Sequence, residues 1–150
     1  MKIKTALILC AGFGKRVQPI TDSLPKPLIV YKNETLLENT INFLVKLKIE
    51  KIKINVFYLK EKITDFINKK KFPINIEIVD DGEIILGTGG GTLSLINKVN
   101  EDDVLVINPD TIWDDSYIKS IDAMVKIYFE RQIKNILLIV NNSTCFDKRF

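Results

Sequence analysis

Two glycines and two cations near the N-terminus have the types and spacing of a site for a polyanion. Gly12 and Gly14 follow an apolar run, and glycines at such a position let backbone N–H groups approach a phosphate closely. Lys15 and Arg16 come directly after them. The planar guanidinium of Arg16 suits phosphate oxygens, whereas Lys15 is a mobile point charge for which simple solvation is the alternative.

A third cation and a carboxylate extend this set. Lys26 follows Arg16 by ten residues and stands between Pro25 and Pro27, which predict a stiff, extended segment around it. Asp110 comes directly after another apolar run. A carboxylate at the carboxyl end of a strand that faces a phosphate site is a natural Mg²⁺ ligand, so Asp110 is the candidate metal ligand.

A second glycine-rich stretch covers residues 87–91, where four of the five residues are glycine. An ordinary turn does not need so many glycines, because each loses extra backbone entropy on folding. We expect a loop that makes close backbone contact with a flat or phosphorylated ligand. A flexible linker is the alternative.

Two common phosphate-binding motifs do not fit the first stretch. A P-loop needs a glycine five residues before Gly14 and a Ser or Thr after the Gly-Lys pair, where this chain has Arg16. A dinucleotide fingerprint needs a third glycine, where this chain has Val17. Both motifs are therefore excluded.

Apolar periodicity places the candidate residues directly after predicted strands. Strands are expected at residues 5–10, 52–58, 74–79, 104–107 and 136–140, with residues 74–79 nearer a sheet edge. Helices are expected at about 35–48, around 63–67 and at 117–128, the last with Asp114 and Asp115 at its start. This alternation predicts one α/β domain over residues 1–150, a three-layer αβα Rossmann-like fold with a mostly parallel sheet.

Composition limits the chemistry. The chain of 150 residues is 46% hydrophobic and 27% charged, as in a soluble globular protein. It has no signal peptide and no apolar run near the roughly 20 residues of a membrane span, which predicts a cytoplasmic protein without a membrane partner. The absence of histidine excludes His-based general-base catalysis. Two cysteines are too few for a disulfide framework or zinc cluster, and Cys10 is expected to be packed.

Lysines are concentrated between residues 46 and 71. This segment contains nine lysines and only three acidic residues. A nucleic-acid surface is one interpretation of such a segment. It contains no arginine and no interleaved stacking aromatics, so solvated faces are favoured and no nucleic-acid partner is expected.

Taken together, these segments resemble the signature of the sugar-1-phosphate nucleotidyltransferases, the GT-A-like pyrophosphorylases. The matching segments are residues 9–16, Pro19-Ile20-Thr21, Pro25-Lys26-Pro27-Leu28, the Leu-Gly-Thr-Gly-Gly at 86–90 and Asn108-Pro109-Asp110. Cys10, Ile20 and Pro109 depart from the family pattern. The triple glycine most resembles N-acetylmuramate-1-phosphate uridylyltransferases, while the Leu-Gly-Thr-Gly-Gly spelling is shared with mannose- and heptose-1-phosphate guanylyltransferases.

The resemblance implies two partners: an NTP, of UTP or GTP type, and a sugar-1-phosphate. Their reaction would give an NDP-sugar and pyrophosphate. Arg16 and Lys26 would be catalytic, and Asp110 would bind the Mg²⁺ cofactor. The implied nucleotide-binding residues are Leu9, Ala11, Gly12, Phe13, Gly14, Lys15, Gly82, Gly87, Thr88, Gly89 and Gly90.

The resemblance also implies a second metal-binding aspartate after a later strand and a C-terminal sugar-binding half. We therefore expect a chain truncated at its C-terminus. The alternative function is a non-catalytic nucleotide-binding domain of the same fold. A homodimer is left open.

Overall fold

The computed structural model describes residues 2–139. The chain divides into two compact units, residues 1–114 and 115–150. The first unit contains a parallel sheet and all the predicted site residues. The described part of the second contains helix α4 (Ser116–Glu130). Asp115 is at its N-cap position, so Asp115 precedes the first turn, in which it was predicted to lie. Within residues 2–139, no helix has both the length and the apolar character needed to cross a membrane.

Four strands form the sheet of the first unit: β1 (Thr5–Leu9), β4 (Lys51–Val56), β5 (Asn75–Asp80) and β6 (Val104–Ile107). Their order is β5-β4-β1-β6, and every neighbouring pair is parallel. The predicted parallel sheet is therefore confirmed, as is the position of the 74–79 strand at an edge. Chains that start at a central strand and fill both of its sides are typical of nucleotide-binding α/β folds.

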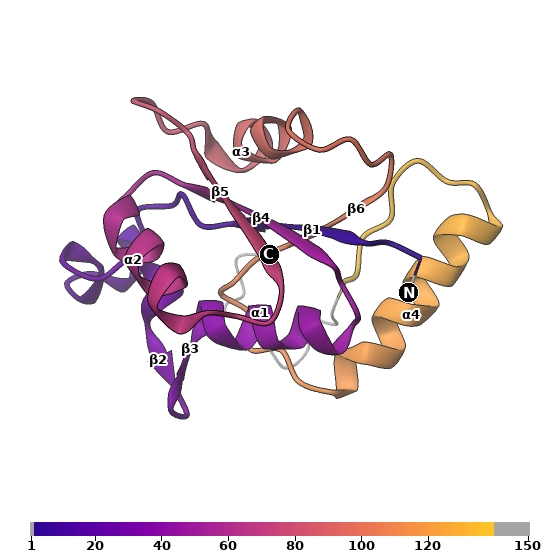
Figure 1. Ribbon diagram of the computed structural model, residues 1–150, viewed down its shortest axis with the longest axis horizontal. Helices are drawn as coiled ribbons and strands as arrows, with labels where there is room; N and C mark the ends of the chain where they lie inside the picture. Colours follow the sequence, from indigo (N-terminus) through magenta and orange to yellow (C-terminus); the bar gives the residue numbers. More distant parts are fainter. Residues whose placement is uncertain (1, 140–150) are drawn as a thin grey trace. The chain divides into compact units, whose positions relative to one another are not determined.

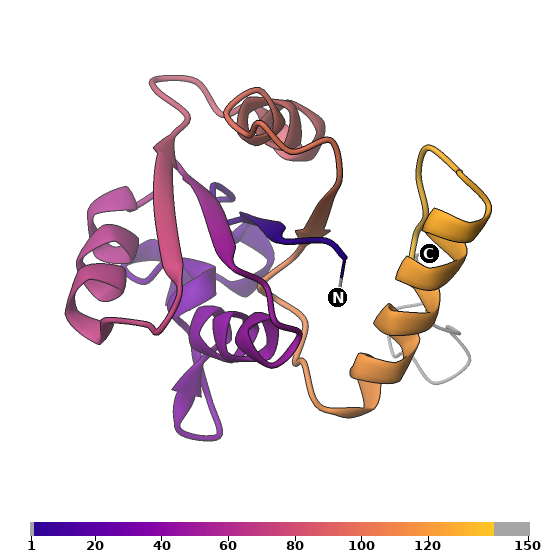
Figure 2. The ribbon, with the colours of Figure 1, turned by 45° about the vertical axis from the view of Figure 1, so that its right-hand side comes forward.

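Helices cover both faces of this sheet. Figures 1 and 2 show α3 (Gly87–Ile96) on one face and α1 (Leu36–Lys46) and α2 (Lys60–Lys70) on the other. Leu95 of α3 packs against the buried Leu7 and Val79. Thr35 caps α1 by accepting a hydrogen bond from the Glu38 N–H. Three layers are therefore present within the first unit, as predicted.

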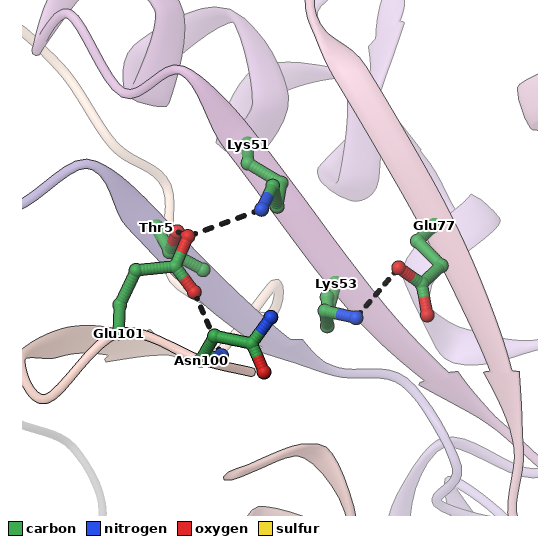
Figure 3. Close-up of polar contacts among 6 residues, drawn as sticks. All are labelled: Thr5, Lys51, Lys53, Glu77, Asn100 and Glu101. Atoms are coloured by element: carbon green, nitrogen blue, oxygen red, sulfur yellow. Dashed lines mark hydrogen bonds and ion pairs between the residues drawn. The ribbon is translucent and has the colours of Figure 1, made fainter. Parts of the chain in front are cut away.

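Polar side chains join the strands at the amino end of the sheet (Figure 3). The Glu101 carboxylate accepts hydrogen bonds from the Thr5 hydroxyl at 2.8 Å and from the Lys51 ammonium at 3.1 Å. Lys53, which is only 5% exposed, pairs with Glu77 at 2.5 Å. A buried ammonium needs such a partner, because burial of an unpaired charge is costly.

Between β1 and α1 the chain forms three 3₁₀ turns, Lys15–Val17, Ile20–Asp22 and Lys26–Leu28, and then a hairpin of β2 (Val30–Tyr31) and β3 (Glu34–Thr35). The predicted extended conformation holds for Pro25 but is wrong for Lys26, which begins the third turn. Leu28 N–H donates to Pro25 O at 2.8 Å. Pro27 fits inside this turn because its missing N–H is not needed there.

The loop predicted at residues 87–91 is wrong. These residues form the first turns of α3. Glycine has a low helix propensity, so the glycines in this part of α3 need an explanation other than propensity. The space around two of them provides one. At Gly91 an added Cβ would lie 2.6 Å from Asn55 Nδ2, and at Gly90 it would lie 2.9 Å from Leu86 Cβ. Gly87 has φ +66°, which favours glycine at the start of the helix.

The predicted strand at 136–140 is not formed over residues 136–139, and residue 140 lies outside the described residues. Leu137 and Ile139 are each 81% exposed. A run of apolar residues becomes a strand only where a neighbouring strand pairs with its backbone, and the described residues provide none for this segment.

Candidate functional site

A cleft of about 300 Å³ opens at the carboxyl ends of β1 and β6. Successive strands extend the sheet from β1 to β4 and β5, and the chain then returns to place β6 on the other side of β1. Ligands of open α/β sheets bind at this kind of switch point. The residues that line the cleft are Leu9, Cys10, Gly12, Gly14, Lys15, Arg16, Val17, Lys26, Pro27, Thr88, Asn108, Pro109 and Asp110.

The two glycines after β1 have different structural roles. Gly14 has φ +67°, and a Cβ added there would lie 2.8 Å from Thr21 Cγ2. The fold itself therefore requires glycine at this position. Gly12 has no positive φ, and a Cβ built on it would meet no atom within 4 Å. The open space beside Gly12 lies in the cleft, where a missing side chain lets a ligand approach the backbone.

Contacts with neighbouring elements hold the loop after Gly14 in place. The Thr21 hydroxyl donates to Gly14 O at 3.0 Å, and the Tyr58 hydroxyl donates to Thr21 O at 2.9 Å. The Phe13 ring packs against Tyr58 at a centroid distance of 5.2 Å, and Lys15 Nζ lies 5.4 Å from the Phe13 centroid. Phe13 therefore helps to hold the loop through its ring, and its predicted contact with the nucleotide stays a prediction.

Opposite charges meet inside the cleft. Lys26 Nζ lies 2.5 Å from Asp110 Oδ2, and the two side chains are 28% and 40% exposed. They come from segments 84 residues apart in the sequence. Because both side chains remain partly open to solvent, a ligand in the cleft can reach either group. Pro109, in place of the family's glycine, does not prevent Asp110 from facing this cleft.

A second cavity of about 180 Å³ adjoins the cleft. It shares Leu9, Gly12, Thr88 and Asn108 with the cleft and is completed by Ala11, Asn55, Ile85 and Gly87. No charged side chain is among these lining residues of the described chain. A charged cleft next to an uncharged cavity suits a ligand with an anionic end and a flat, neutral end.

Asn55 supports this second cavity and was missed by the sequence analysis. Its side chain is 2% exposed, accepts from the Cys10 N–H at 2.9 Å and donates to Asp81 Oδ2 at 2.7 Å. It thus joins β1, β4 and the segment after β5 directly below Gly91. An Asn in an apolar strand is the signal that could have identified this position, because buried amides need partners.

Cys10 does not act as a nucleophile in the cleft. It is 1% exposed, and burial, followed by the nearby Asp110 charge, raises the pKa of its thiol far above the usual range. The thiolate is the reactive form of cysteine, so this side chain is inert. The predicted packing role of Cys10 agrees with its burial.

The structure brings most of the predicted site residues together. Those that line the cleft or the adjoining cavity are Leu9, Ala11, Gly12, Gly14, Lys15, Arg16, Lys26, Gly87, Thr88 and Asp110. Among the described residues, four predicted ones lie outside both cavities: Phe13 in the aromatic contacts, Gly82 in the turn after β5, and Gly89 and Gly90 within α3.

Several members of the lysine-rich segment have partners. Lys51, Lys53, Lys60 and Lys70 pair with Glu101, Glu77, Asp80 and Glu38, and Lys62 donates to the carbonyl of Ser23. These contacts lower the charge that the segment offers to a polyanion. They favour the interpretation as ordinary protein surface over a nucleic-acid interface.

Comparison with known proteins identifies related sequences. A family model described as nucleotidyl transferase matches residues 5–146. The bifunctional protein GlmU of Methanococcus maripaludis is 40% identical over 117 residues, which are 78% of this chain and 27% of the relative. The N-acetylmuramate alpha-1-phosphate uridylyltransferase of Caulobacter vibrioides is 26% identical over 143 residues, which are 93% of this chain and 59% of the relative. The chain thus spans less than two thirds of either relative.

Comparison with solved structures supports the same fold. The UDP-glucose pyrophosphorylase of Acinetobacter baumannii superposes with a TM-score of 0.74 at 24% sequence identity. The match covers 87% of this chain and 54% of that protein. At this level of identity the likeness shows the fold: a Rossmann-like α/β sheet, as the sequence predicts.

Proposed function

The chain belongs to the nucleotidyl transferase family, and on this basis we propose that it transfers a nucleotidyl group from an NTP to a sugar-1-phosphate. The products would be an NDP-sugar and pyrophosphate. The observation that carries the proposal is the meeting of Arg16, Lys26 and Asp110 in one cleft, beside a glycine turn and an uncharged cavity. A nucleoside triphosphate has the matching anionic and neutral ends.

The proposed chemistry needs no general base. A phosphate oxygen of the sugar-1-phosphate is already ionised at neutral pH and can attack the α-phosphorus directly. The bond from the α-phosphorus to the bridging oxygen then breaks, and pyrophosphate leaves with that oxygen's electron pair. Such an in-line transfer depends on positioning and charge neutralisation. A chain without histidine can therefore perform it.

Each charged residue has a proposed role. Arg16 binds the triphosphate and the departing pyrophosphate, because its planar fork pairs with two phosphate oxygens at once. Lys26 binds phosphate oxygens between the nucleotide and the sugar phosphate. Gly12 and its neighbours offer backbone N–H groups to the phosphates, and the cavity beside Asn55 and Ile85 receives the nucleoside. The base is proposed to be uracil or guanine.

Asp110 is the proposed ligand for Mg²⁺. Within residues 2–139, no group of three or more His, Cys, Asp or Glu side chains could hold a metal ion by itself. Mg²⁺ is usually held by one or two carboxylates together with substrate phosphates and waters, so a single carboxylate in a phosphate cleft fits this ion. The bound ion would neutralise negative charge on the phosphate oxygens during transfer.

The test is a pyrophosphate-release assay with UTP or GTP and a panel of sugar-1-phosphates. We expect Lys26→Ala and Asp110→Asn each to lower the rate by a factor on the order of 10² to 10³, because each removes an electrostatic contact with the reacting phosphates. Lys60→Ala is the matched control, since Lys60 forms a similar exposed ion pair with Asp80 at 2.6 Å, outside the cleft.

Two results would contradict parts of this proposal. If an active chain keeps its rate after Lys26→Ala or Asp110→Asn, the role assigned to that residue is wrong. If the chain binds NTP with Mg²⁺ but releases no pyrophosphate with any sugar phosphate, it is a nucleotide-binding domain without turnover.

A further inference from the structure

Trp113 fixes the loop that carries Asp110 to helix α1. The side-chain amide of Asn39 makes two hydrogen bonds to the main chain of Trp113. The Trp113 N–H donates to Asn39 Oδ1 at 2.8 Å, and Asn39 Nδ2 donates to Trp113 O at 3.0 Å. Asn39 and Trp113 are 74 residues apart in the sequence, so this pairing brings two distant elements together.

The side chain of Trp113 holds the other end of the same loop. Its indole N–H donates to Asn108 O at 3.2 Å. Its ring stacks on Phe43 at a centroid distance of 5.2 Å and an interplanar angle of 14°, and Phe43 is 2% exposed. The loop at 108–113 is therefore closed on itself and packed on the buried surface of α1, with Asp110 between its two fixed ends.

Asn39 is itself held in position. Its Nδ2 also donates to Glu34 Oε1 at 2.9 Å, and the other oxygen of Glu34 accepts from Asn42 at 3.2 Å. The amide of Asn39 thus has a defined orientation, with its oxygen toward the Trp113 N–H. Asn42 lies on the same helix and donates to the same carboxylate of Glu34, which lies outside the 108–113 loop.

We propose that Asn39 and Trp113 are positioning residues that set the Asp110 carboxylate for metal binding. This inference rests on the proposed role of Asp110. Asn39 fixes the main chain of Trp113, and Trp113 fixes the loop through Asn108. Loss of either contact lets the carboxylate sample orientations that do not meet a metal held by the triphosphate. Groups that hydrogen-bond a metal ligand directly typically change metal affinity by about 10- to 100-fold when they are removed. Asn39 and Trp113 act on Asp110 through the main chain of the loop, so we expect the lower end of this range.

The test measures Mn²⁺ affinity from the electron paramagnetic resonance signal of free Mn²⁺, in the presence of UTP and, separately, of GTP. We expect Asn39→Ala to weaken Mn²⁺ binding by about 10-fold. Trp113→Phe keeps an aromatic ring beside Phe43 but removes the indole N–H, and it should give a smaller loss. Trp113 is the sole tryptophan of the chain, so its fluorescence in the unmutated protein should change as Mn²⁺ binds.

Asn42→Ala is the matched control, because it removes a hydrogen bond to Glu34 and leaves Trp113 untouched. We expect its Mn²⁺ affinity to stay within twofold of the unmutated chain. A purely structural role for Asn39 predicts a lower melting temperature with unchanged Mn²⁺ affinity, and this result would overturn the inference. If Asn39→Ala does not fold, the Mn²⁺ affinity of Trp113→Phe tests the inference in its place. An unchanged affinity in that variant would overturn the inference.

The Mn²⁺ affinity of Asp110→Asn distinguishes a failure of the positioning role from a failure of the proposed metal site. If Asp110→Asn leaves Mn²⁺ affinity unchanged, the proposed metal site is wrong. If Asp110→Asn weakens Mn²⁺ binding and neither Asn39→Ala nor Trp113→Phe does, the metal site stands and the positioning role fails.

Discussion

Gly12 and Gly14 lie two residues apart in the turn after β1, yet different constraints act on them. Gly14 has a left-handed φ and a neighbour at 2.8 Å from the position of an added Cβ, whereas Gly12 has neither. Gly12 also borders both cavities of the site. The fold therefore requires glycine at position 14 but not at position 12, where we propose that the missing side chain leaves room for the ligand.

This difference predicts opposite effects of the same substitution. Gly12→Ala should change the free energy of unfolding by less than about 1 kcal/mol, because its backbone suits alanine. It should weaken nucleotide binding by about 10-fold or more, since a methyl group then occupies the site. Gly14→Ala should lower stability by about 1–2 kcal/mol or more through backbone strain. Urea unfolding and nucleotide titration measure the two effects. Equal loss of stability in both variants would refute the distinction.

At the residue scale, sequence reasoning identified side chains whose chemistry is visible locally. Arg16, Lys26 and Asp110 each follow a strand or a turn and carry charge, so their position at the ligand end of the sheet could be predicted. Asn39, Asn55 and Trp113 were missed, because their roles depend on partners 26 to 74 residues away in the sequence. The local sequence can mark Asn55 as a buried amide that needs partners, but it does not show which residues those partners are.

At the scale of elements, Glu101 joins the connection between α3 and β6 to the starts of β1 and β4. The pKa of Glu101 is lowered from 4.5 to about 2, mainly because the Thr5 hydroxyl donates to its carboxylate and secondly because Lys51 does. Both hydrogen bonds are stronger to the ionised carboxylate than to the neutral acid, so they favour the ionised form in the folded chain. This contact is therefore sensitive to acid.

We expect a defined pH dependence of stability from this contact. The pKa of Glu101 is lower in the folded chain, so the unfolded chain binds more protons at acidic pH. The contribution of Glu101 is complete above about pH 4.5 and is lost as the pH falls toward 2. Glu101→Gln should therefore flatten the acid side of the stability profile, measured by urea unfolding between pH 6 and pH 3. An unchanged slope would show that Glu101 does not contribute.

The element boundaries show where sequence patterns are sufficient. The strands predicted at 5–10 and 104–107 form at 5–9 and 104–107. The first is almost wholly buried, whereas Val106 in the second is exposed. The glycine-rich segment at 87–91 was assigned as a loop because propensity disfavours a helix there. The segment instead begins α3, and Asn55, which comes from a distant strand, lies so close to Gly91 that the helix has room only for glycine there.

At the scale of the first unit, the two ends of the sheet differ in the residues that they carry. The amino end carries paired charges that join neighbouring strands, such as Lys51 with Glu101 and Lys53 with Glu77. The carboxyl end carries the cleft with Arg16, Lys26 and Asp110. The strand order explains the position of this cleft. The chain adds β4 on one side of β1 and later β6 on the other, and a crevice forms at the carboxyl ends of the strands where the direction changes.

The central claim is that this cleft binds a nucleoside triphosphate with Mg²⁺, and a thermal-shift panel tests it most directly. A ligand that binds only the folded chain raises its melting temperature. With UTP, GTP, CTP, dTTP and ATP tested in the presence of Mg²⁺, we predict the largest rise for UTP or GTP. The rise should be smaller in Asp110→Asn and unchanged in Lys60→Ala. If none of the five nucleotides raises the melting temperature of the unmutated chain, the claim is contradicted.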